Sequence, residues 1–170
     1  MDTRKSDIIK QLTENRGEVV AFFRPLSPEV LALRVYPESP AWTVKQVLAH
    51  FVTIERSMHW LFNNILSGGP GSPKDFDIDR FNRTQPKKLD EHSLEELTLQ
   101  FEEVRAETIS IVEKMSQEDL QRIGWHVFHG NDTLERFVRW AYEHVNLHID
   151  DIRKVIRACV SEFKKKSIEP

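Results

Sequence analysis

The sequence is poor in cysteine and in long apolar runs, and each shortage excludes a class of protein. Its single cysteine, Cys159, excludes an intramolecular disulfide. The longest apolar run, residues 19–23, is far too short to span a membrane, so we expect no membrane partner. Residues 1–7 are polar and lead directly into a helical pattern, so we expect no signal peptide and a cytoplasmic protein.

A strong charge of one sign is also absent. The net charge is −3 at pH 7, and no basic patch is interleaved with aromatic residues, so we expect no nucleic-acid partner. The sequence has no phosphate-binding glycine loop, nucleophile elbow or cysteine nucleophile that would point to another class of enzyme. The composition, with 39% hydrophobic and 30% charged residues, is typical of a soluble globular protein. Such a chain can form a real core, and we expect a single domain over residues 1–170.

Apolar residues recur at intervals of three and four, the period of an amphipathic helix, and no stretch shows the alternation of a strand. Three of the predicted helices begin at capping residues, which are Thr43, Ser93 with Glu96, and Asp132 with Glu135. The predicted long helices cover residues 4–23, 43–66, 93–115 and 132–163, with short helices expected over 28–33 and 116–121.

The connection between the second and third long helices, residues 67–92, is rich in glycine, proline and aspartate. Connections this long are uncommon inside a compact domain and are often functional. This one can run the length of a helix, so the helices that it joins are expected to lie parallel. The pattern therefore predicts an all-α protein, a four-helix bundle with a long crossover and an up-down-down-up order of helices.

Three histidines are the most informative residues. His144 and His148 are four residues apart, so both imidazoles lie on one face of the predicted fourth helix. His50 lies on the predicted second helix, beside its apolar face. If the three meet, they can hold a divalent ion with one position left open, which is the arrangement of catalytic metal sites. Zinc proteases with this His spacing have a glutamate where Val145 stands here, which argues against that class.

Acidic residues near these histidines have two interpretations each. Asp151 and Glu143 either accept hydrogen bonds from the ligand imidazoles or are ordinary surface charges. Glu55 lies on the apolar face of the predicted second helix, where a carboxylate needs a partner. It is therefore either a member of an ion pair or part of the site.

The remaining histidines and the cysteine give weaker indications. His126 and His129 either line the mouth of a pocket or pack within a loop. His59 is expected on a helix surface, and Cys159 in the core. A bundle whose histidines bind nothing is the third interpretation, and it predicts that His50 lies far from the other two.

Three segments resemble DinB-like proteins. Residues 42–50, WTVKQVLAH, resemble the start of the second helix of that family, and residues 141–152, AYEHVNLHIDDI, resemble its fourth helix. Residues 79–82, DRFN, resemble a crossover pattern that brings Asn82 near the pocket. The resemblance implies a four-helix bundle in which His50, His144 and His148 hold a divalent metal. Nickel and zinc are the favoured candidates. The resemblance also implies a homodimer, as in many members.

Characterised relatives include thiol transferases that use bacillithiol, mycothiol or glutathione, and a mycothiol-dependent maleylpyruvate isomerase. By resemblance we expect a metal-dependent thiol S-transferase that joins a small-molecule thiol to an electrophile in detoxification or stress response. Glu55 and Asn82 are the candidate catalytic residues. A metal-dependent hydrolase and a non-catalytic protein that binds a metal or small ligand are the alternatives. An open metal position beside a deep cleft favours an enzyme, and a fourth protein ligand favours the binding protein.

Overall fold

The computed structural model describes residues 3–38 and 40–166, with the side chains of residues 3 and 162–166 left aside. The terminal residues 1–2 and 167–170 of the expected domain lie outside the described part. The elements in chain order are α1 Thr3–Phe23, α2 Pro28–Leu31, α3 Val44–Leu66, α4 Ile78–Thr84, the 3-10 helix η1 Pro86–Leu89, α5 Leu94–Lys114, α6 Gln117–Leu120, β1 Ile123–His126, β2 Gly130–Thr133 and α7 Leu134–Lys166.

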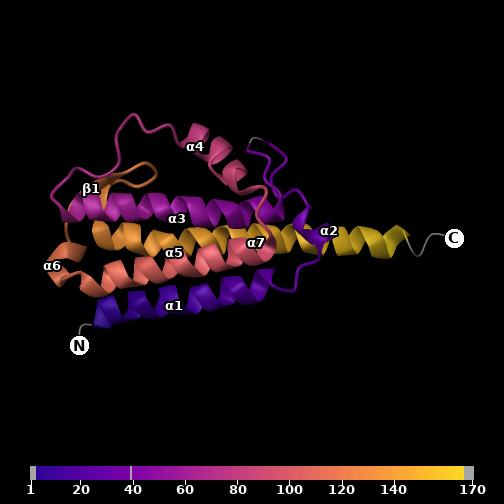
Figure 1. Ribbon diagram of the computed structural model, residues 1–170, viewed down its shortest axis with the longest axis horizontal. Coiled ribbons are helices and arrows are strands. Elements are labelled where there is room, and N and C mark those ends of the chain that lie inside the picture. The colour runs from indigo at the N-terminus through magenta and orange to yellow at the C-terminus, as the bar shows by residue number, and fades with distance from the viewer. Residues whose placement is uncertain (1–2, 39, 167–170) are drawn as a thin grey trace.

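The four long helices α1, α3, α5 and α7 form a bundle (Figure 1). Helices α1 and α3 each pack against both α5 and α7. Helices α3 and α5 run in the same direction, opposite to α1 and α7, because the crossover returns along the whole length of the bundle (Figure 1). The predicted four-helix bundle with up-down-down-up order is therefore confirmed. Within the described residues, no helix is both long and apolar enough to cross a membrane.

Capping residues fix where α3 and α5 begin. Thr43 Oγ1 accepts a hydrogen bond from the Gln46 N–H, and the Gln46 side chain accepts one from the Thr43 N–H. Ser93 and Glu96 form the same reciprocal pair before α5. Both caps satisfy backbone donors that have no partner inside the helix, so these two predicted helix starts are correct.

The predicted cap of the fourth helix is wrong. Asp132 and Glu135 do not form a reciprocal pair, because Asp132 belongs to strand β2 and is not at the capping position. Thr133 Oγ1 instead accepts a hydrogen bond from the Arg136 N–H at 3.3 Å. The Glu135 carboxylate is bound to the guanidinium of Arg139.

The expectation that the chain has no strand is also wrong. Strands β1 and β2 pair antiparallel, with Ile123 opposite Thr133 and His126 opposite Gly130. Each strand has four residues, which is too few for a clear alternation of apolar and polar side chains. The hairpin lies beside the start of the crossover, where Trp125 N–H donates to the Pro70 carbonyl at 2.7 Å.

The crossover contains α4 and η1 and lies over one side of the bundle (Figure 1). Pro86 and Leu89 of η1 are buried, and η1 packs against α3. The connection is thus folded onto the bundle and forms an outer wall beside α3. This wall and the hairpin create the cavity described below.

The core divides into two apolar clusters along the bundle. One cluster contains Phe23, Phe51 and Phe101, and the other contains Leu12 and Phe62. Beyond the first cluster, α7 extends past the ends of the other long helices (Figure 1). Cys159 lies in the C-terminal part of α7 and is half-buried, so its expected place in the core is wrong.

Candidate metal centre

His50 of α3 meets His144 and His148 of α7. The His144 Nε2 atom lies 2.9 Å from His148 Nε2 and 3.3 Å from His50 Nε2. One ring nitrogen from each of the three residues lies within 4.8 Å of the other two. Among the described residues, the cluster has no fourth member that is a histidine, cysteine or carboxylate. The interpretation in which His50 lies far from the pair is therefore wrong.

The three nitrogens fit a divalent transition metal. Nitrogens bound at about 2.0–2.1 Å to one tetrahedral ion lie about 3.3 Å apart, close to the two separations observed here. A neutral imidazole has one proton and one lone pair, so each of the three rings can direct a lone pair at the centre of the cluster. A shared cation would interact favourably with all three lone pairs. Imidazole ligands suit zinc, nickel, copper and iron alike, so the donors alone do not select the metal.

Burial keeps these imidazoles neutral. It lowers the pKa of His50 well below the ordinary value, with further lowering from His144 and His148. Burial followed by repulsion from His148 lowers the pKa of His144 to about 3. Burial lowers the pKa of His148 to about 4, although Asp151 opposes the shift. At neutral pH all three rings therefore have a lone pair available for a metal.

Tyr36 links His148 to Asp151. The Tyr36 hydroxyl lies 2.5 Å from His148 Nδ1 and donates to Asp151 Oδ2 at 3.1 Å. Burial, followed by the charge of Asp151, raises the pKa of Tyr36, so the hydroxyl stays protonated. Because this hydroxyl donates to the carboxylate, its oxygen can accept the Nδ1–H of His148. The expected contact between Asp151 and a ligand histidine thus runs through Tyr36, a residue that no pattern in the sequence indicated.

The other two histidines are held differently. The Trp42 indole stacks on His50, with ring centroids 4.3 Å apart and an angle of 29° between the planes. Trp140 packs beside His144, with centroids 5.3 Å apart. The Nδ1 atoms of His50 and His144 are buried without a hydrogen-bond partner among the described residues. Glu143 is paired with Arg136, so of its two interpretations the contact with a ligand imidazole is not found among the described residues.

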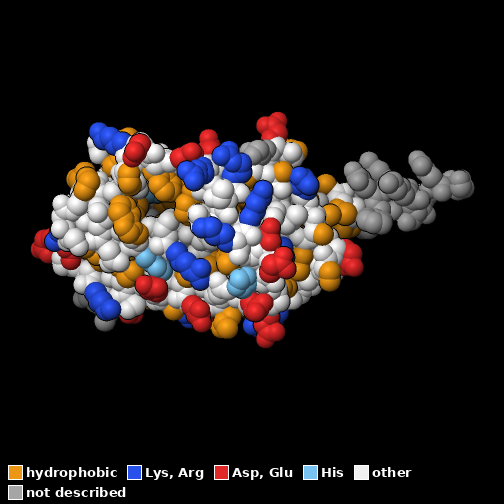
Figure 2. All heavy atoms as spheres, turned by 45° about the horizontal axis from the view of Figure 1, so that its top comes forward, with side chains coloured by type: hydrophobic (Ala, Val, Ile, Leu, Met, Phe, Trp, Pro, Cys, Tyr) orange, Lys and Arg blue, Asp and Glu red, His pale blue; other side chains and the backbone are white. Residues whose placement is uncertain are grey.

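The three histidines lie on the wall of a cavity of about 650 Å³. The cavity is enclosed by α3, α7, the segment before α3, the crossover and the hairpin. Figure 2 shows apolar side chains gathered around a hollow on the face that carries the crossover, near the hairpin end of the molecule. The open side of the histidine cluster therefore faces a space large enough for a small molecule.

Two sequence candidates line this cavity. Asn82 of α4 does so, and its Oδ1 atom is buried with no hydrogen-bond partner among the described residues. His126, the last residue of β1, also lines the cavity, whereas His129 is not part of the lining. The interpretation that these histidines line a pocket is therefore correct for His126 and not for His129.

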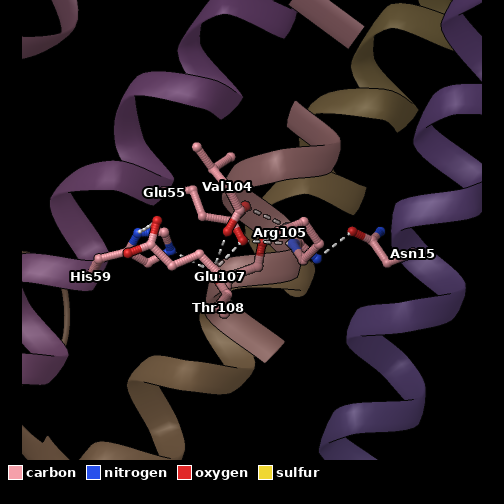
Figure 3. Close-up of polar contacts among 8 residues, drawn as sticks. Asn15, Glu55, His59, Val104, Arg105, Glu107 and Thr108 are labelled. Atoms are coloured by element: carbon pink, nitrogen blue, oxygen red, sulfur yellow. Dashed lines mark hydrogen bonds and ion pairs between the residues drawn. The ribbon is translucent and has the colours of Figure 1, made fainter. Parts of the chain in front are cut away.

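Glu55 does not line the cavity and is a member of a buried ion pair between α3 and α5 (Figure 3). Arg105 Nε donates to Glu55 Oε1 at 2.6 Å, and Nη2 donates to Oε2 at 2.9 Å. Thr108 Oγ1 donates to the same Oε1 at 2.6 Å. Arg105 also donates to Asn15 at 2.8 Å, so the group joins three helices of the bundle.

His59 belongs to this buried group, and its expected place on a helix surface is wrong. The residue is 7% exposed, and Nε2 lies 2.8 Å from Thr108 Oγ1 (Figure 3). Since Thr108 donates to Glu55, His59 Nε2–H is the donor to Thr108. The sequence signal that could have revealed this is the four-residue spacing between Glu55 and His59, which places both on one helix face.

No curated protein matches the chain. Among solved structures, YfiT from Bacillus subtilis has the same fold, with a TM-score of 0.76 and 16% sequence identity over 94% of this chain and 90% of that one. YfiT is described as a probable metal-dependent hydrolase with an unusual four-helix bundle topology. A family model described as the DinB superfamily matches residues 11–152. The match covers α3 and α5, large parts of α1 and α7 and the three histidines, and the chain therefore belongs to the DinB superfamily.

Proposed function

We propose that the protein is a divalent-metal-dependent hydrolase of small molecules, with His50, His144 and His148 as the metal ligands. One observation carries the proposal: three imidazole nitrogens converge on the wall of a cavity of about 650 Å³. Three protein ligands and an open side facing a cavity are typical of catalytic sites, whereas a fourth protein ligand is typical of structural ones. This feature supports an enzyme over a protein that only binds a metal.

His50, His144 and His148 would hold a divalent ion. Such an ion would supply a water or thiol of lowered pKa that can act as a nucleophile near neutral pH. The chain's own residues hold and orient the ligands. Tyr36 and Asp151 fix the tautomer and orientation of His148, and Trp42 restrains the His50 ring. Hydrophobic walls exclude bulk water, which strengthens electrostatic interactions between the site and a substrate.

The charge of the cavity favours water over a thiol cofactor as nucleophile. None of the described residues that line the cavity is a lysine or arginine. Thiols such as glutathione carry carboxylates, which need a cationic partner when they leave water. The description of YfiT as a probable metal-dependent hydrolase agrees with this choice.

The thiol S-transferase expected from the resemblance is the second candidate. The size of the cavity supports it, because about 650 Å³ is enough for a small electrophile together with a small uncharged thiol. Nickel or zinc as the metal, a homodimer, a cytoplasmic location and a role in stress response stay predictions from the resemblance. We assign Glu55 a structural role, and Asn82 a role in binding the substrate.

Metal analysis tests the proposal. The untagged protein is stripped with a chelator, reloaded with zinc or nickel, and compared with a His144→Ala/His148→Ala variant. We expect about one ion per chain in the wild type and a large loss in the variant. His92→Ala is the matched control, because His92 lies outside the cluster, and it should keep its metal. Equal metal content in all three proteins would contradict the assignment of the ligands.

An activity screen then separates the two candidates. The reloaded enzyme is offered uncharged aromatic esters and amides in water, and electrophilic substrates with an uncharged thiol. Metal-dependent turnover without a thiol supports hydrolysis. Turnover that requires the thiol supports the transferase instead, and no metal-dependent turnover in either screen would count against an enzyme.

A further inference from the structure

The cavity wall next to the histidines is apolar and almost free of charge. Trp42, Met58, Leu61 and Phe76 belong to the lining. Apart from the histidines, the one ionisable side chain with a charge at neutral pH among the described lining residues is that of Glu38. It lies at the exposed edge of the cavity. An anion that enters this space loses its hydration without gaining a cationic partner, which is unfavourable.

Two large apolar side chains form the rim. Trp60 of α3 is 53% exposed, and Phe128 of the hairpin turn is 56% exposed, yet both line the cavity. Exposed aromatic groups continuous with a concave apolar surface are typical of a binding site. The Phe128 ring lies 6.5 Å from the Trp140 ring, which lies 5.3 Å from the His144 ring, so the Phe128 side of the rim is linked to the histidine cluster.

Two polar side chains of the lining, His126 and Asn82, can bind a ligand inside this apolar space. His126 Nδ1 accepts a hydrogen bond from the Phe128 N–H at 3.1 Å, so the ring proton lies on Nε2. Among the described residues, none forms a hydrogen bond with that Nε2–H. Asn82 Oδ1 is buried without a partner. These two residues thus offer a hydrogen-bond donor and an acceptor, which match the carbonyl and N–H of an amide.

We propose that the cavity binds an uncharged aromatic molecule with an amide or similar carbonyl group, and that it excludes the corresponding carboxylate. The aromatic ring packs against the Trp60 and Phe128 rim, and the polar end reaches His126 and Asn82. The inference rests on the proposed function only in treating the cavity as the route to the three histidines. Binding itself depends on the cavity wall.

Calorimetry with a matched pair of probes tests the inference. The probes are 2-naphthamide and 2-naphthoate, which share a ring system and differ in charge. The full-length protein is used in its metal-free form, because a carboxylate could otherwise bind to a metal ion. We expect 2-naphthamide to bind about ten-fold or more tightly than 2-naphthoate, since a buried anion has no partner in this cavity.

Rim variants locate the binding site. Trp60→Ser and Phe128→Ser should each weaken the binding of 2-naphthamide several-fold. Leu99→Ser is the matched control, because Leu99 is also exposed but lies outside the cavity, and it should leave binding unchanged. Glu38→Lys should strengthen the binding of 2-naphthoate and leave that of 2-naphthamide nearly unchanged. The substituted side chains are exposed, so we expect all four variants to fold.

The outcomes distinguish failure of this inference from failure of the proposed function. Failure of 2-naphthamide to bind, or equal binding of the two probes, would overturn the inference. Equal loss of binding in Leu99→Ser and the rim variants would also overturn it, because the binding site would then lie elsewhere. Selective binding of 2-naphthamide by a protein that takes up no metal would support the inference and contradict the proposed function.

Discussion

Tyr36 shows how a residue far from the histidines in sequence can set the geometry of the centre. Its hydroxyl joins His148 Nδ1 to the Asp151 carboxylate. We expect Tyr36→Phe to lower metal affinity by about 10–100-fold, because the imidazole loses the partner that fixes its orientation. Competition with a chelator measures the affinity. Tyr142→Phe is the control, since Tyr142 contacts Arg139 and should leave metal affinity unchanged.

The Glu55–Arg105 pair is expected to matter for folding. Both side chains are buried, and removing one partner leaves an uncompensated charge. We expect Glu55→Gln to reduce the free energy of unfolding by about 3–5 kcal/mol in urea titrations, with full metal content retained.

An exposed pair gives the contrast for this prediction. Arg153 and Asp150 form an ion pair on the surface of α7. Asp150→Asn should cost less than about 1 kcal/mol, because exposed pairs contribute little. If Glu55→Gln lost its bound metal and kept its stability, Glu55 would have to be assigned to the metal site.

His59 should make stability depend on pH. Burial lowers the pKa of His59 below 6.5. The charges of Glu107 and Glu55 oppose this shift, and the positive charge of Arg105 lowers the pKa further. Between the folded-state pKa and 6.5, the unfolded chain binds more protons than the folded chain. The contribution of His59 to stability is therefore complete above pH 6.5 and decreases as the pH falls below it.

Urea titrations at several pH values check this expectation. His59→Gln keeps hydrogen-bonding capacity toward Thr108 but does not titrate. Its stability should fall less steeply than that of the wild type as the pH is lowered from about 7 to about 5. Parallel curves for the two proteins would show that His59 contributes nothing to the pH dependence.

At the scale of elements, the hairpin depends on a close approach to the crossover. Gly71 has a φ of 96°, and a Cβ atom added there would lie 2.4 Å from the Trp125 carbonyl oxygen. We expect Gly71→Ala to cost more than about 1 kcal/mol and to displace His126, because the backbone cannot relax without moving β1. Thermal unfolding and binding of a cavity ligand should both be affected.

The control for this prediction is another glycine. Gly17 lies within α1, and a Cβ added there meets no atom within 4 Å. Gly17→Ala should raise stability by about 0.4–1 kcal/mol, because alanine loses less conformational entropy in a helix. Loss of cavity binding in Gly17→Ala as well would show that binding does not depend on the position of the hairpin.

The elements also show why prediction from the sequence succeeded in some places. The helices repeat a 3.6-residue pattern over several turns, and Thr43 and Ser93 mark two of their starts. The spacing of His144 and His148 directs both rings to one face before any tertiary structure is known. His50 joins them because α3 packs against α7, and the resemblance to a family supplied that expectation.

Other features depend on contacts between distant segments. Tyr36 lies in the irregular segment between α2 and α3 and contacts His148, which is far away in sequence. His59 looked like a surface residue because its partner Thr108 is on another helix. The hairpin is stabilised in part by hydrogen bonds between Trp125 and the crossover, which no local pattern reveals.

At the scale of the whole molecule, the proposed metal would tie α3 to α7. An ion that binds the folded chain and not the unfolded chain stabilises the fold by mass action, by about 2.7 kcal/mol at 100 times its Kd. Zinc or nickel should therefore raise the thermal midpoint of the stripped wild type. The same metals should leave the thermal midpoint of the His144→Ala/His148→Ala variant nearly unchanged. Equal increases in the midpoints of the two proteins would indicate that the metal binds elsewhere.

The crossover has a consequence for how such a protein can diversify. The proposed metal ligands come from α3 and α7, whereas part of the cavity wall comes from residues 67–92 and from the hairpin. In a bundle with alternating helix directions, a short turn would replace the crossover and this outer wall would be missing. The up-down-down-up order would thus separate the part that performs the proposed chemistry from the part that selects the ligand. Insertions and substitutions in the crossover can change specificity while the helices that carry the histidines stay the same.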